Sequence, residues 1–125
     1  MYFIIFDNIF KLNTRDTSYV LAITDKGHVE HIYYGKRLPD ENFDALRLKN
    51  TIMLGTTVDY EGQDVGYSMD TMLLEYSGIG KGDFRHSPIE LIMPDGSFVC
   101  DFVYDSYSVS EGEFKCDDSS LPYAI

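Results

Sequence analysis

The residues that could most readily take part in catalysis or binding lie in one glycine-rich stretch, residues 75–88. Glycines alternate with other residues at positions 78, 80 and 82, and Asp83 and Arg85 then bracket an aromatic residue. Glycine adopts left-handed and extended backbone angles at little steric cost, so this density predicts an irregular loop whose backbone lies close to another segment. The partners of Asp83 and Arg85 therefore decide what the loop does.

Several side chains in and around this loop are of types that hydrolytic enzymes use. Asp70, Glu75 and Asp83 are carboxylates of the kind that a glycosidase holds about 5 to 9 Å apart across its cleft. His86 and Ser87 are a base and a nucleophile, but neighbouring residues on an extended segment point away from each other. The residues alone predict no self-contained catalytic constellation.

Phosphate and metal sites are not expected. Residues 78–82 carry Lys81 among their glycines, but they lack the Gly-Lys-Ser/Thr ending and the following helix of a phosphate loop. His28 and His31 are three residues apart, so on a strand their side chains would point to opposite faces and would not share a metal. We therefore expect no cofactor and no metal ion.

The composition is that of an acidic globular domain. The 125 residues suffice for one domain with one core, and 44% apolar residues argue against disorder. The net charge of −11 repels polyanions, so nucleic acid and anionic membranes are poor partner classes.

Cys100 and Cys116 lack zinc-site spacing, and residues 1–6 are too short an apolar run for a signal peptide or a membrane span. A cytoplasmic location with reduced thiols is the expectation.

Strand signals dominate the first third of the chain. Apolar, aromatic and β-branched residues predict two hairpins, with turns at Asp7-Asn8 and around Gly27. The four expected strands are residues 1–6, 9–12, 17–24 and 28–34. Tyr19 belongs to the best alternating strand, in which every second residue is apolar or aromatic.

Three later segments carry different secondary-structure signals. Residues 40–50 fit either a strand or a helical turn, and residues 51–69 are polar and glycine-bearing, which predicts a long surface connection. Residues 89–93 and 97–104 are predicted as strands joined by a Pro-Asp-Gly turn.

The strand predicted at 97–104 sets the orientation of its side chains. Alternation places Phe98, Cys100, Phe102 and Tyr104 on a buried face and turns Asp101 toward water on the other. With no helix of three turns anywhere, the fold class is all-β, an antiparallel β-sandwich.

Five stretches of the chain carry a more specific signal. They are residues 13–20, 31–38, 70–76, 80–88 and 121–123, and the Gly-Asp-Phe-Arg-x-x-Pro pattern at 82–88 is their core. In order and spacing these stretches resemble the amino-terminal region of family 36 glycoside hydrolases, the bacterial α-galactosidases. The resemblance extends over essentially the whole chain.

The resemblance implies a fold and an activity that composition does not reveal. In that family a large β-supersandwich precedes a (β/α)8 barrel, and the barrel holds two catalytic aspartates for retaining hydrolysis of α-linked galactose. Residues 1–125 then form a single domain from the opening part of the supersandwich, without the barrel. No catalytic residue of the family falls within them, so these residues alone are not expected to be catalytic.

The resemblance also implies a role in the assembled enzyme. Similar proteins form tetramers in which a sandwich loop helps to frame the sugar pocket of a neighbouring subunit. The matching positions are Asp70, Asp83 and Arg85, and the fork of arginine donors suits carboxylates and sugar hydroxyls. The resemblance thus implies a homo-oligomer and an α-galactoside substrate. The alternative is that Asp83 and Arg85 pair with neighbours and only brace the loop.

A second functional class remains open on the residues alone. A free-standing carbohydrate-binding module of this size could use exposed aromatic side chains as a sugar platform. The residues for such a platform are Tyr33, Tyr34, Tyr76 and Phe84. The competing interpretation is that these aromatics pair across strands in a core.

Overall fold

A computed structural model describes residues 2–40, 43–47, 60 and 67–112. Its centre is a four-stranded antiparallel sheet in the order β1-β2-β3-β4, a simple meander. The strands are β1 (Tyr2–Phe6), β2 (Ile9–Asn13), β3 (Thr17–Ile23) and β4 (Val29–Lys36). The short 3-10 helices η1 (Asp44–Leu46) and η3 (Met69–Thr71) follow. The all-β prediction is confirmed, and no helix in the described ranges is long and apolar enough to cross a membrane.

Both hairpins predicted in the first third of the chain are present. Phe6 pairs with Ile9, so Asp7 and Asn8 alone form the first turn, and Asp7 adopts a positive φ of 49°. Gly27 takes a φ of 88° in the second hairpin, where its N–H donates to the Thr24 carbonyl at 2.9 Å. These turns join neighbouring strands, which is why local sequence sufficed to predict them.

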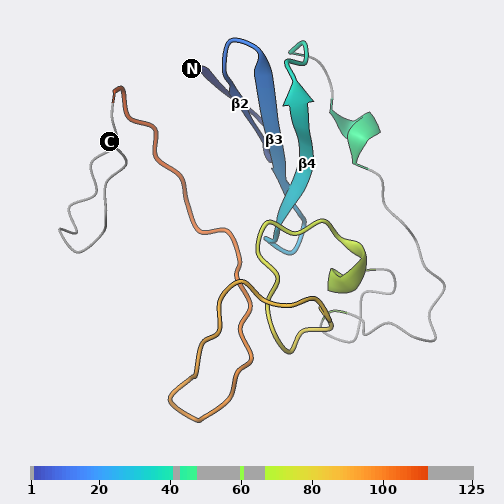
Figure 1. Cartoon of the computed structure of the whole chain (residues 1–125), viewed down its shortest axis with the longest axis vertical. Helices are drawn as coiled ribbons and strands as arrows, with labels where there is room; N and C mark the ends of the chain where they lie inside the picture. Colours follow the sequence, from blue (N-terminus) through green and yellow to red (C-terminus); the bar gives the residue numbers. More distant parts are fainter. Residues whose placement is uncertain (1, 41–42, 48–59, 61–66, 113–125) are drawn as a thin grey trace.

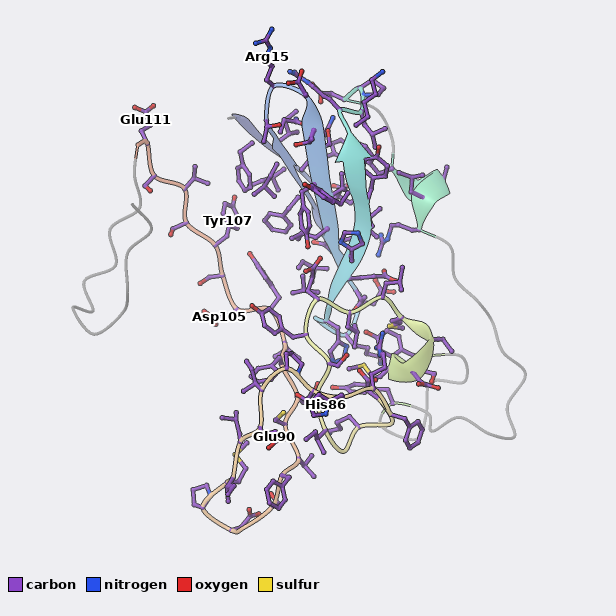
Figure 2. The ribbon with its side chains drawn as sticks, viewed as in Figure 1. Arg15, His86, Glu90, Asp105, Tyr107 and Glu111 are labelled. Carbon is purple, nitrogen blue, oxygen red and sulfur yellow. The ribbon has the colours of Figure 1, made fainter. Side chains whose placement is uncertain are left out.

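The two faces of the sheet are covered differently. One face carries the buried cluster of Ile9, Val20 and Ala22, against which Ile32, Tyr33 and Phe43 pack. On the other face Phe10 contacts the rings of Phe3, Tyr104 and Tyr107. The segment that carries Tyr107 returns along the sheet from the far end of the molecule (Figures 1 and 2).

A buried lysine fixes the chain that leaves the sheet. The side chain of Lys11, 1% exposed, places its ammonium 2.7 and 2.8 Å from the carbonyls of Leu38 and Pro39 and 2.6 Å from Asp40 Oδ1. The same ammonium lies 5.2 Å from the centre of the Phe43 ring. Three acceptors match the three N–H donors of an ammonium, so the charge is buried without an unpaired donor.

Residues 67–112 contain no assigned strand and gather mainly at the end of the sheet where β3 turns into β4 (Figure 1). The predicted Pro-Asp-Gly turn is present, with Gly96 at a φ of 83° and a 2.9 Å hydrogen bond from Met93 N to Ser97 O. The flanking segments are not strands, so that part of the prediction is wrong. Their backbone groups bond to turns and loops instead: Tyr104 N donates to Gly27 O at 2.7 Å.

The side-chain pattern predicted for residues 97–104 is also partly wrong. Cys100 is buried as expected, but Phe98 and Phe102 are exposed, and Asp101 turns inward to His28 instead of facing water. Simple alternation fails because, among the described residues, no strand pairs with this segment to keep its pleat regular. Cys116 lies outside the described residues.

Residues 40–50 and 51–69, predicted as an ambiguous segment and a surface connection, lie partly within the described residues. Residues 44–46 form η1, which agrees with the helical-turn alternative for residues 40–50. Most of the predicted surface connection at 51–69 lies outside the described residues, but Tyr60, Ser68 and Met69 are buried. The connection therefore contributes to the packed interior at these positions.

Replacing Lys11 with Ala removes the donor from two carbonyls and one carboxylate. We expect the free energy of unfolding to fall by about 2 kcal/mol, because the Leu38 and Pro39 carbonyls lose their donor, whereas the Asp40 side chain is 49% exposed and is solvated instead. Urea unfolding followed by circular dichroism measures the change. The exposed Lys36→Ala variant is the control, with an expected change within about 0.5 kcal/mol. Equal stability of the two variants would show that the Lys11 contacts contribute little.

Candidate functional site

The glycine-rich loop lies directly against a distant segment. A β-carbon built on Gly78 would collide with the carbonyl oxygen of Cys100, and one on Gly80 would come within 2.7 Å of Val99. Cys100 N also donates to Ile79 O at 3.0 Å. Glycine is needed at 78 because the two backbones approach too closely for any side chain. The prediction that this loop approaches another segment is confirmed.

Arg85 is the centre of the loop. Its Nε and Nη2 donate to the two carboxylate oxygens of Asp83 at 2.8 and 2.9 Å, a fork-to-fork pair. Nη2 also donates to Met69 O at 2.8 Å, and Nη1 donates to Met72 O. The guanidinium thus joins the 83–85 turn to both ends of η3. We call this set of contacts the Arg85 clamp.

The carboxylate in this clamp is fully enclosed. The Asp83 side chain is 0% exposed, and its Oδ1 also accepts from Arg85 N at 3.1 Å. Burial alone raises the pKa of a carboxyl, but the hydrogen bonds and the charge of Arg85 outweigh burial and hold the pKa of Asp83 below its usual value. Asp83 is therefore ionised at neutral pH, and its carboxylate oxygens are engaged in hydrogen bonds with Arg85.

The three predicted site residues come together, with different surroundings. Asp70 lies in η3, between the two carbonyls that Arg85 binds, and its side chain is exposed. Phe84, 71% exposed, projects from the turn between the two clamped residues. The clamp uses Asp83 and Arg85 to brace the loop and leaves Asp70 and Phe84 presented to solvent.

The other candidate catalytic groups do not assemble into a site. Ser87 is buried and donates to Ser77 O at 2.8 Å, whereas His86 is exposed on the loops far from Arg15 and the β2–β3 turn (Figure 2). Glu75 accepts from Tyr19 and contacts His31, so it is not directed at the Asp83 carboxylate. The Ser-His pair and the carboxylate set are not formed.

His28 belongs to a buried network that sequence reasoning missed. Its Nε2 donates to Asp101 Oδ1 at 2.9 Å, while Tyr60 OH donates to Asp101 Oδ2 at 2.6 Å. A carboxylate only accepts, so Nε2 carries a proton, and Nδ1 lies 2.6 Å from Tyr67 OH, which also contacts Thr24. Burial, with nearby acidic charges, raises the pKa of Tyr67 to about 12. We call this the His28 network.

The location of this network explains why it escaped prediction. It joins the β3–β4 turn to residues 60, 67 and 101, and His28 and Asp101 are 73 positions apart. No local pattern signals such a contact. His28 and His31 enter separate networks, and within the described ranges no group of three metal-ligating side chains occurs.

The aromatic platform proposed from sequence is split. Tyr33 packs against the sheet core, whereas Tyr34 is exposed and contacts Tyr19 on the other face. Tyr76 contacts Phe102, and Phe84 projects from the clamped turn. The four rings therefore do not form one surface.

Comparison with known proteins identifies the family. A family model described as the glycosyl hydrolase family 36 N-terminal domain matches residues 27–125. The chain belongs to glycosyl hydrolase family 36. The resemblance to the amino-terminal region of this family is thereby confirmed.

Relatives of this family 36 domain are α-galactosidases by name. The chain is 31% identical over 119 residues to α-galactosidase Mel36A of Lactobacillus acidophilus, covering 94% of this chain and 16% of that protein. It is 28% identical over 114 residues to α-galactosidase AgaA of Geobacillus stearothermophilus, covering 91% of this chain and 15% of the relative.

Solved structures agree in fold and extent. The crystal structure of the family 36 α-galactosidase AgaB from Geobacillus stearothermophilus aligns with a TM-score of 0.79 at 26% identity, over 94% of this chain and 16% of that one. A variant of AgaA in complex with raffinose aligns with a TM-score of 0.76. The family 36 domain described here thus spans about a sixth of these relatives.

Removing the clamp should destabilise this family 36 domain. Arg85→Ala leaves the enclosed Asp83 carboxylate without its counter-ion, so we expect a loss of about 3 kcal/mol in the free energy of unfolding. The exposed Arg15→Ala variant is the matched control, expected to change by less than about 0.5 kcal/mol. Urea unfolding measures the free energy of unfolding of both variants. An Arg85→Ala protein as stable as the control would show that the Arg85 clamp does not stabilise the domain.

Acid should weaken the domain through Asp101. Burial raises the pKa of this carboxyl, but hydrogen bonds from Tyr60 and His28 hold it below its ordinary value of 3.8. A depressed pKa contributes stability that is present above the unfolded-state pKa and lost as pH falls through the folded-state value. The stability difference between wild type and Asp101→Asn should therefore shrink as pH falls below about 5 and continue to shrink below 3.8. A difference independent of pH, measured by urea unfolding, would exclude this linkage.

Proposed function

We propose that this chain is the amino-terminal β-sandwich domain of a longer α-galactosidase that hydrolyses α-linked galactosides in a separate barrel domain. The observation that carries the proposal is the family 36 match over residues 27–125. The relatives that carry the same domain are named α-galactosidases, and this chain aligns with only 11–16% of their length. The chemistry then belongs to the remaining part of such a protein, by retaining hydrolysis on two barrel aspartates.

The domain's own contribution is to complete a neighbouring active site. The Arg85 clamp holds η3 and the 83–85 turn in one geometry, so Asp70 is presented on a braced support. A side chain held by packing and hydrogen bonds can position a substrate with little loss of conformational entropy. Asp70 is the residue proposed to reach the sugar pocket of an adjacent subunit, with Asp83 and Arg85 supporting it.

A role in assembly is consistent with the surface. The hairpin around Gly96 and the segment after it expose apolar side chains that a monomer would leave in water. They include Ile89, Leu91, Ile92, Phe98, Val99 and Val103. The proposed protein is a cytoplasmic homo-oligomer without a cofactor, and the net charge of −11 disfavours nucleic acid and anionic membranes as partners.

Activity measurements test the enzymatic part of the proposal. The 125-residue chain should not hydrolyse a nitrophenyl α-galactoside, because no barrel aspartate is present in it. A longer protein with this domain at its amino terminus should release nitrophenol and galactose from the same substrate. Turnover by the 125 residues, or an inactive longer protein with intact barrel aspartates, would contradict the proposal.

Sedimentation tests the assembly. At tens of micromolar we expect the 125-residue chain to sediment as a dimer or larger species, since the exposed apolar face favours association. Ile92→Glu should shift it toward monomer, whereas Ser110→Glu adds the same charge at an exposed polar site and should not. A wild-type chain that sediments as a monomer under these conditions would count against assembly through this domain.

A further inference from the structure

We propose that the domain carries a second saccharide site, formed by Tyr19, His31, Tyr34 and Glu75 on the face of the sheet opposite the buried cluster. The expected ligand is the pyranose ring of a neutral saccharide. We call this set of four residues the Tyr34 site. It lies on strands β3 and β4 and on residue 75, so it is separate from Asp70 and the Arg85 clamp.

Three rings form the base of the site. Tyr19 lies in the centre, with the His31 ring 5.2 Å away at a steep angle and the Tyr34 ring 5.9 Å away. Tyr34 is 68% exposed although it is a large aromatic residue within a strand. Such a ring offers an apolar face with a polar tip, which matches the C–H face of a sugar with hydroxyl groups at its rim.

A β-bulge in the pairing of β3 with β4 brings these rings together. Val20 pairs with Tyr33, but Leu21 pairs with His31, so Ile32 is an extra residue in β4. In a regular strand, residues three apart such as His31 and Tyr34 would lie on opposite faces. The β-bulge places both beside Tyr19. Bulges often re-aim side chains next to functional sites, and this one has that effect.

The carboxylate of the site is held by the backbone. Residues 73–75 run along β4: His31 N donates to Leu73 O at 2.6 Å, and Glu75 N donates to Val29 O at 2.9 Å. Glu75 Oε1 then accepts from Tyr19 OH and lies 3.1 Å from His31 Nδ1. Burial and the Glu75 hydrogen bond raise the pKa of Tyr19 to about 12, so the tyrosine remains a donor. A site built on paired strands keeps its geometry before a ligand arrives.

The polar groups of the site retain bonding capacity. Within the described part of the chain, the side-chain hydrogen bonds of Glu75 use Oε1 and that of His31 uses Nδ1, which leaves Glu75 Oε2 and His31 Nε2 for a ligand. Both side chains are partly exposed. A carboxylate oxygen accepts from sugar hydroxyls, and an imidazole nitrogen donates or accepts as its tautomer allows. The Glu75 charge and the net charge of −11 disfavour anionic saccharides, so a neutral ring is the expected class.

Calorimetric titration of the 125-residue chain with raffinose and, separately, with maltotriose tests the site. We expect millimolar binding of at least one of them. Tyr34→Ala and Glu75→Gln should each weaken it by about tenfold, the loss of one stacking or charged hydrogen-bonding contact. Tyr34→Phe keeps the ring and should retain binding. The control Phe98→Ala removes an aromatic side chain that is 52% exposed elsewhere, and should bind as wild type does.

Two outcomes would overturn the inference. One is the absence of heat from either sugar with a chain whose circular dichroism and urea unfolding show that it is folded. The other is binding that Tyr34→Ala and Glu75→Gln leave unchanged. The use of raffinose rests on the proposed function, whereas maltotriose does not. Turnover of α-galactosides by the longer protein is measured separately, so failure of this site and failure of the proposed enzyme are distinguishable.

Discussion

The structure of the candidate loop depends on one guanidinium group. The Arg85 guanidinium donates four hydrogen bonds, two to the carboxylate of Asp83 and two to the carbonyls of Met69 and Met72. The planar fork of arginine allows this geometry, which a lysine ammonium could not reproduce. Because the carbonyls flank Asp70, a single side chain fixes both the loop and the exposed acid beside it. The bracing and functional interpretations of the loop are therefore compatible: two residues brace, and a third is presented.

Two further buried polar groups act in the same way at other places. Lys11 holds the chain after β4 through Leu38, Pro39 and Asp40, and His28 holds the segment around Asp101. Because the described residues after β4 contain little regular secondary structure, these polar contacts replace the hydrogen-bond ladders that would otherwise position the chain. Such groups are costly to bury and are tolerated because their donors and acceptors are paired. They specify where the irregular half of the domain lies on its sheet.

The contrast between the two halves also explains what sequence could predict. The hairpins of β1 to β4 depend on turns at Asp7 and Gly27 and on alternation, all within a few residues. The close approach of the glycine-rich loop to another segment was likewise predictable from composition. The inward turn of Asp101 was not, because its partner His28 is 73 residues away. The bulge at Ile32 was missed too, since regular alternation assigns His31 and Tyr34 to opposite faces.

A domain that completes an active site on a neighbouring subunit, as we propose for this one, should reveal that role when subunits of two variants are mixed. Two variants of the longer protein are prepared: Asp70→Ala, which alters an exposed side chain, and a replacement of the barrel nucleophile. Each should be nearly inactive alone. Mixed oligomers should regain α-galactosidase activity, because an intact barrel from one variant then meets an intact Asp70 from the other. Full activity of Asp70→Ala alone, or no recovery in mixed oligomers of confirmed composition, would contradict the account.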